Sequence, residues 1–225
     1  MKILGIDTTT KFLCLGIHDN GSNYEYTIEM GRKLSSLLTV TIKRTLDALG
    51  WDIADIDYFA CGLGPGSFTG IRVGVAAIKG LGLALEKPVA GVASLDLLAQ
   101  NADIREGYIV PAVDAKRNLI YCGLYQKTNG RIKRASPHML LTPDEFCRKV
   151  KPHSFILGDA LALYGQEMLK RIKGVNLLDK DHWYPRPQNL IDLALEKIRQ
   201  RKLNSAFDIK PVYLYPKECQ IRKKC

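Results

Sequence analysis

The sequence predicts an α/β protein built from two similar halves. Short apolar stretches typical of strands alternate with longer stretches of helical periodicity, and 225 residues are enough for a sizeable core. Both halves open with an apolar strand that ends in an aspartate and is followed by a hairpin, at 3–7 and again at 108–114. This repetition indicates a duplicated unit. We expect a first lobe over 1–102 and a second over 103–225 with the terminal helix and a basic tail, divided at the polar, turn-rich stretch 101–107.

The elements of the first lobe follow from periodicity and from turn residues. The Asn20-Gly21 pair tolerates positive φ and predicts a hairpin, and Gly50 is a suitable end for the helix before it. Strands are expected at 3–6, 12–17, 24–30, 58–62 and 89–92, and helices at 34–49, at 71–85 and from 94 onward.

The second lobe repeats this alternation and then ends in helices. Strands are expected at 108–113, 119–126 and 155–157, and helices at 161–172, at 189–201 and from Pro143, a residue favoured in a first helical turn. The tail 211–225 contains one short apolar run at 212–215 before a basic end.

The positive charge of the chain, formally +10, lies in its second half. Residues 1–102 carry 9 basic and 10 acidic side chains, whereas 103–225 carry 24 and 13. Such a surplus fits either a well-solvated surface or a polyanionic partner that meets the second half.

Two features predict a cytoplasmic protein. No apolar stretch approaches the ~20 residues of a membrane span, and the first residues lead directly into a charged segment. The six cysteines contain no Cys-x-x-Cys pair, which argues against zinc ribbons and disulfide frameworks and suits a reducing compartment.

The glycine run at 62–70 is the most informative motif. Glycines before a helix can form a phosphate loop, but no Gly-Lys-Ser/Thr ending follows. Gly66, Gly70 and Gly74 recur every four residues on one helical face, where another helix could approach closely. We therefore favour close helix packing over phosphate binding.

Catalytic arrangements are scarce. The four histidines include no pair at helical spacing, so no metal site is expected. Ser67 lacks the second glycine of a nucleophile elbow and is better explained as an N-cap, with Thr69 as the alternative cap. Asp7 and Asp114 could hold a metal or water, although a carboxylate at a strand end more commonly bonds its own turn.

Four motifs together resemble the TsaB (YeaZ) family. They are ILGIDTT at 3–9, GPGSFTGIRVG at 64–74, VDAK at 113–116 before Tyr121, and PVYL at 211–214. The resemblance runs from the first strand to the tail in the same order. It implies the two-lobed actin/hexokinase/Hsp70-like (ribonuclease H-like) fold and a role, beside TsaD and TsaE, in forming N6-threonylcarbamoyladenosine at position 37 of tRNAs that read ANN codons.

The resemblance also implies that this chain is catalytically silent. The two histidine positions of the TsaD-like metal site are held here by Ser94 and Leu98. The nucleotide loops carry extra side chains, and the set expected to be vestigial is Asp7, Thr8, Asp114 and Gly158. No cofactor is expected, with nucleotide possible only at a joint interface with TsaD.

By the same resemblance, helices of the first lobe bind TsaD or, in its absence, a second copy of the chain. The expected interface residues are Leu34, Ser35, Leu37, Leu38, Ile42, Gly66, Ser67, Phe68, Gly70, Ile71 and Gly74. The leucine stripe could instead only cover the sheet. The basic second half, Arg222, Lys223 and Lys224 included, could contact tRNA through the complex. The rival function is an autonomous enzyme of this fold, a phosphotransferase or a metallopeptidase.

Overall fold

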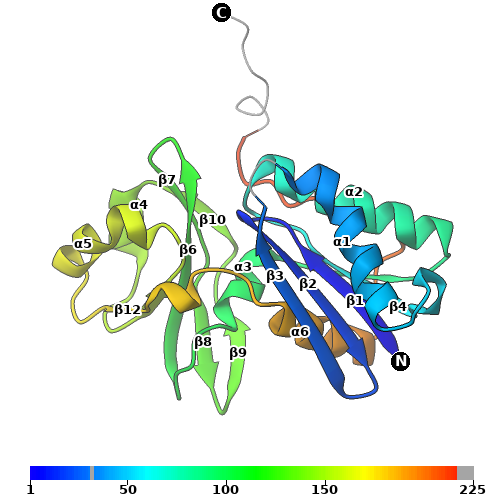
Figure 1. Cartoon of the computed structure of the whole chain (residues 1–225). Coiled ribbons are helices and arrows are strands. Elements are labelled where there is room, and N and C mark those ends of the chain that lie inside the picture. The colour runs from blue at the N-terminus through cyan, green and yellow to red at the C-terminus, as the bar shows by residue number, and fades with distance from the viewer. Residues whose placement is uncertain (31–32, 217–225) are drawn as a thin grey trace, which may run out of the picture.

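The apolar stretches form two mixed β-sheets, one in each lobe, in a computed structural model that describes residues 1–30 and 33–216 (Figure 1). The first sheet has the strand order β3-β2-β1-β4-β5, and the second contains the path β10-β7-β6-β11-β12. In both paths the first two pairings are antiparallel and the last two are parallel. The same topology therefore occurs twice, which confirms the duplicated, actin-like fold.

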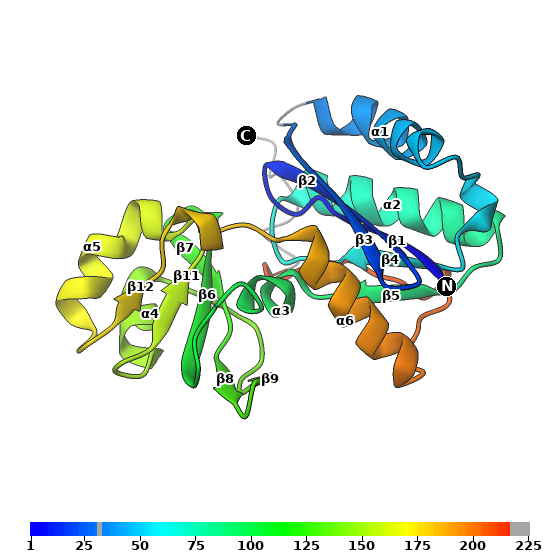
Figure 2. The ribbon, with the colours of Figure 1, turned by 60° about the horizontal axis from the view of Figure 1, so that its bottom comes forward.

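The first lobe has a helical layer on each face of its sheet. Its strands are β1 (Lys2–Asp7), β2 (Phe12–Asp19), β3 (Ser22–Glu29), β4 (Tyr58–Gly62) and β5 (Val89–Val92). Helices α1 (Leu34–Ala48) and α2 (Phe68–Ala84) cover one face, and the short helix η2 (Ile53–Asp55) follows α1. Helix α6 (Pro187–Arg199) covers the other face (Figure 2).

The second lobe adds a hairpin to the shared topology. Its strands are β6 (Gly107–Lys116), β7 (Leu119–Cys122), β8 (Tyr125–Thr128), β9 (Arg131–Arg134), β10 (Met139–Leu141), β11 (Phe155–Leu157) and β12 (Asn176–Leu177). Its helices are α4 (Pro143–Lys149), α5 (Leu161–Arg171) and the short η3 (Lys180–His182). The β8–β9 hairpin pairs with the start of β6, and α3 (Ser94–Ala99) packs against the second lobe from the first.

Two expectations about elements need correction. The strand expected at 119–126 is two strands, β7 and β8, which pair with different parts of β6. They are interrupted at Gly123, where a Cβ would lie 3.0 Å from the Tyr125 ring. Helix α2 begins at Phe68, three residues earlier than expected, because the Ser67 hydroxyl accepts the Gly70 N–H and caps it there. Ser67, and not Thr69, is thus the N-cap.

The division of the chain at about 102 also needs correction, because the last part of the chain returns to the first lobe. Leu190, Ile191 and Ala194 of α6 pack on Ile3 and Ala60 in the first sheet. Farther on, Asn204 bridges to Val89. The first lobe is therefore built from both ends of the chain.

Candidate functional site

A cleft of ≈ 700 Å³ separates the two lobes, at the position where two repeated units face each other. Its lining includes the turn after β1 (Thr9–Lys11), the start of α2, the β6–β7 hairpin (Asp114–Arg117), Asp159 after β11 and the segment 212–215. Lys11, Lys116 and Arg117 bring positive charge to the cleft, whereas Asp114 and Asp159 bring negative charge.

In the first lobe, Asp7 is fully buried and bonds its own turn. Its Oδ1 accepts the Thr9 N–H (2.9 Å) and the Thr9 hydroxyl (2.8 Å), and its Oδ2 accepts the Ser94 hydroxyl (3.1 Å). Burial raises the pKa of this carboxyl, although the three hydrogen bonds oppose the shift. The more common of the two roles weighed for Asp7, bonding the turn, is confirmed.

In the second lobe, side-chain carboxylates of the chain itself accept backbone N–H groups of the corresponding loop. Asp159 Oδ1 accepts the Asp114 N–H (2.9 Å), and Asp114 Oδ1 accepts the Lys116 N–H (2.8 Å). Gly158 (φ 120°) lies so close to β6 that a Cβ would overlap the Ala112 carbonyl oxygen. Burial, followed by the nearby Asp114 charge, raises the pKa of Asp159, while the Asp114 N–H opposes this. The Asp114 and Lys116 N–H groups of this loop are therefore paired with carboxylates of the chain, whereas a phosphate-binding loop offers such donors to its ligand.

The three spaced glycines lie against a turn of the same chain, which corrects the expectation that another helix covers them. A Cβ at Gly66 would overlap the Thr9 carbonyl oxygen, one at Gly70 the Thr8 carbonyl oxygen, and one at Gly74 the Thr8 hydroxyl. The Thr8 hydroxyl also donates to the Gly70 carbonyl oxygen (2.7 Å). The close approach was predictable from the spacing, but its partner was not.

The leucine stripe of α1 faces the core of its own lobe. Leu34, Leu38 and Ile42 are buried there, as is Ile71 of α2. Leu37 and Val40 point outward with exposed fractions of 38% and 41%, and Ser35 is exposed beside them. The interpretation that the stripe covers the sheet is therefore confirmed for the buried members.

An apolar groove of ≈ 440 Å³ runs between α1 and α2, and sequence reasoning missed it. Its lining includes the apolar Ile42, Leu46, Trp51, Ile53 and Leu81 together with the charged Lys43, Asp47 and Asp52. On the α2 side it is lined by Ala76, Ala77 and Gly80. The small residues at 76 and 80, one helical turn apart, were the available signal.

A terminal strap, residues 211–215, joins the start of α2 to the second lobe. Arg72 Nε donates to the Tyr213 hydroxyl (3.1 Å), and the Arg72 guanidinium lies 3.7 Å from the centre of the Phe68 ring, which is 42% exposed. Two residues farther on, the Tyr215 hydroxyl donates to the Ala115 carbonyl oxygen (2.9 Å). The strap therefore contacts both lobes along the cleft.

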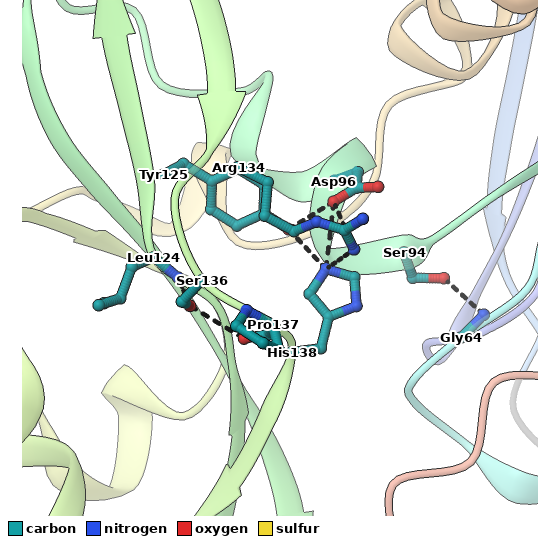
Figure 3. Close-up of polar contacts among 9 residues, drawn as sticks. All are labelled: Gly64, Ser94, Asp96, Leu124, Tyr125, Arg134, Ser136, Pro137 and His138. Carbon is teal, nitrogen blue, oxygen red and sulfur yellow. Dashed lines mark hydrogen bonds and ion pairs between the residues drawn. The ribbon is translucent and has the colours of Figure 1, made fainter.

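A second link between the lobes is a polar cluster around Asp96 of α3 (Figure 3). Asp96 Oδ1 accepts the Tyr125 hydroxyl (2.7 Å) and lies 3.1 Å from His138 Nε2 and 3.7 Å from Arg134. Burial would raise the pKa of Asp96, but hydrogen bonds with His138 and Tyr125 outweigh it and lower the pKa. The cluster joins α3 of the first lobe to β8, β9 and the segment before β10.

Comparisons with known proteins agree with this geometry. A family model described as "TsaD: tRNA N6-adenosine threonylcarbamoyltransferase" matches residues 28–172. The tRNA threonylcarbamoyladenosine biosynthesis protein TsaB of Bacillus subtilis is 30% identical over 203 residues, which is 88% of this chain and 88% of that protein. The chain belongs to the TsaB (YeaZ) family. TsaB of Escherichia coli is 27% identical over 95% of this chain and 94% of its own length.

A solved structure gives the same result for the fold of this TsaB-family chain. YeaZ from Pseudomonas aeruginosa matches with a TM-score of 0.81 and 26% identity, over 94% of this chain and 100% of that one. The family relationship identifies the chain as a tRNA threonylcarbamoyladenosine biosynthesis protein.

The positions that the resemblance relates to metal ligands have other tasks in this TsaB-family chain. The Ser94 hydroxyl accepts the Gly64 N–H (3.1 Å; Figure 3) while donating to Asp7, and Leu98 is buried in the core. Within 1–30 and 33–216, no three His, Cys, Asp or Glu side chains are grouped so that they could hold a metal ion. In the same residues, no helix combines the length and the apolar character that a membrane span needs.

Proposed function

We propose that this chain is a non-catalytic scaffold and activator subunit, which supports threonylcarbamoyl transfer to tRNA by TsaD in an assembly that TsaE joins in the cytoplasm. The observation that carries the proposal is the contrast between the cleft and the helical face. In the cleft, Asp7, Asp114 and Asp159 take the backbone amides that a phosphate would need. On the face of α1 and α2, by contrast, an apolar groove is open.

The proposed contact surface combines that groove with the exposed edge residues. Leu37 and Phe68 supply exposed apolar side chains, and Ser35 and Ser67 lie beside them. The half-buried Gly66 and the buried Leu34, Leu38, Ile42, Gly70, Ile71 and Gly74 fix the two helices from beneath. Association through such a face would bury the apolar side chains of the groove, and the charged Lys43, Asp47 and Asp52 also line it. The same surface, applied to a second copy, would give a homodimer when TsaD is absent.

The test is the affinity for the cognate TsaD, measured by pull-down and by titration. A Leu37→Asp variant places a charge in the proposed contact and should weaken binding at least tenfold, on the order of a central interface residue. Leu163→Asp is the matched control, because Leu163 is 63% exposed on α5 of the other lobe.

Two results would contradict the proposal. One is absence of binding at micromolar concentration together with full transferase activity of TsaD without this chain. The other is low-micromolar ATP binding by this chain alone, which would favour the autonomous enzyme.

A further inference from the structure

The second lobe concentrates unpaired positive charge along one edge of its sheet. Strands β6, β11 and β12 are parallel and begin at the same edge, so the segments that precede them meet there, and α4 and α5 end there (Figure 2). The β8–β9 hairpin, paired with the first residues of β6, extends this edge. The cations of this basic edge are Arg105, Lys127, Arg131, Lys133, Lys149, Lys151 and Lys173.

These cations have no acidic partners within the described part of the chain. None of the seven forms an ion pair there, and all but the half-buried Lys127 are exposed. Neighbouring Arg171, by contrast, pairs with both Asp144 and Glu167. Two carboxylates, Asp103 and Glu106, lie in the segment before β6, and Glu106 accepts the Asn129 N–H. The basic edge thus carries a clear surplus of positive charge.

Strand register arranges part of this charge in a regular pattern. Tyr108 of β6 is opposite Gln126 of β8, which is opposite Lys133 of β9. Arg131 and Lys133 project from the same face of β9, and alternate residues of a strand are ~6.6 Å apart. Lys151 Nζ lies 4.0 Å from the centre of the Tyr108 ring. Spacings of this order suit successive phosphates of a nucleic acid strand better than a single small anion.

We propose that the basic edge binds the phosphate backbone of RNA. The identity of that RNA, the tRNA that the assembly modifies, rests on the proposed function. Phosphate contacts from lysine and arginine need charge and reach but no base-specific geometry, which fits exposed side chains on loops and a hairpin. An anionic membrane is the less suitable partner, because peripheral membrane surfaces combine cations with a cluster of exposed apolar side chains, whereas Leu169 at the end of α5 is a single exposed apolar residue among the described residues that meet at this edge.

The test is tRNA binding by the full chain alone, followed by fluorescence anisotropy between 50 and 300 mM salt. The edge variant carries Arg131→Glu, Lys133→Glu and Lys151→Glu. Its matched control carries Arg199→Glu, Arg201→Glu and Lys202→Glu, the same change of charge on exposed residues at the end of α6. The edge variant should bind at least tenfold more weakly at 100 mM salt. The slope of log K against log salt should fall by about 2 to 3, since each phosphate contact contributes about 0.7–0.9.

Several outcomes would overturn the inference. They are an equal loss in both variants, which would reflect net charge alone, an unchanged slope in the edge variant, and no binding of tRNA by the wild-type chain at 50 mM salt. Phosphatidylserine vesicles form a second arm, and edge-dependent vesicle binding without edge-dependent tRNA binding would also overturn it.

The proposed function is tested separately by the affinity of the same variants for TsaD. The edge variant should bind TsaD normally, so a failure of the scaffold proposal and a failure of the RNA surface give different results. Thermal unfolding of each variant confirms that it is folded. The tail residues Arg222, Lys223 and Lys224 lie outside the described residues and take no part in this argument.

Discussion

Two glycines of α2 provide a matched test of whether the close approach to the turn after β1 requires glycine. Gly74 faces Thr8, and an added Cβ would overlap the Thr8 hydroxyl, far inside the 3.0 Å that real Cβ atoms keep. Gly80 lies in the same helix, and an added Cβ there would meet nothing within 4 Å. We expect Gly74→Ala to destabilise the protein and Gly80→Ala to stabilise it.

The magnitudes follow from two opposing effects. Replacing glycine by alanine within a helix gains about 1 kcal/mol at either site. At Gly74 the fully buried Thr8 hydroxyl must also move and lose its bond to the Gly70 carbonyl oxygen, which costs about 1–3 kcal/mol. The two variants should therefore differ by about 2 kcal/mol. For a domain of this size, that is a difference of ~4–8 °C in Tm.

Urea and thermal unfolding of the two variants measure this difference. A Thr8→Ala/Gly74→Ala double variant adds a sharper test, because removal of the hydroxyl makes room for the new methyl group. The two changes should then be non-additive, with the double variant more stable than the sum of the single effects predicts. Equal stability of Gly74→Ala and Gly80→Ala would refute the packing argument, as would strict additivity in the double variant.

Three further predictions concern the buried Asp7, the half-buried Asp96 and the strap. Burial raises the pKa of Asp7 above its ordinary value of 3.8. The contribution of Asp7 to the free energy of unfolding is therefore complete below pH 3.8 and decreases as the pH rises through the raised pKa. An Asp7→Asn variant should lack this decrease when unfolding is measured as a function of pH. The pKa of Asp96 shifts in the opposite direction, because the hydrogen bonds with His138 and Tyr125 outweigh the effect of burial. The contribution of Asp96 to the free energy of unfolding is therefore present above pH 3.8 and is lost as the pH falls through the lowered pKa. An Asp96→Asn variant should remove this loss of stability at acid pH. Tyr215→Phe removes the bond to the Ala115 carbonyl oxygen, so amide hydrogen exchange in 211–215 should accelerate about 2- to 10-fold, while a Tyr24→Phe control should leave it unchanged.

Sequence periodicity predicted most elements because each lobe buries one face of each of its main helices. The terminal aspartates were also predictable, since a carboxylate at a strand end has its own turn within reach, as Asp7 and Asp114 show. The family resemblance then supplied the fold and the biosynthetic role, neither of which follows from periodicity.

Long-range packing accounts for what the sequence did not predict. The apolar face of α6 is compatible with either sheet, and only the folded chain shows that it covers Ile3 and Ala60 of the first. The β9 strand, RIKR, lacks a buried face and therefore has no apolar alternation to detect. Likewise, the spacing of the glycines at 66, 70 and 74 predicted a close approach but could not indicate that Thr8 and Thr9 make it.

The polar contacts that join the two lobes bear on the proposed scaffold function. In an actin-like fold, two lobes flank a cleft whose ligand can contact both. In this chain the lobes are joined by the Asp96 cluster, by the Tyr215 hydroxyl on the β6–β7 hairpin, and by Asn101, whose amide donates to the carbonyl oxygens of His182 and Tyr184. Each of these contacts is made by the chain's own polar groups. A fixed arrangement of this kind would hold the α1–α2 groove and the basic edge in a constant orientation, which a subunit that positions TsaD and tRNA relative to each other requires.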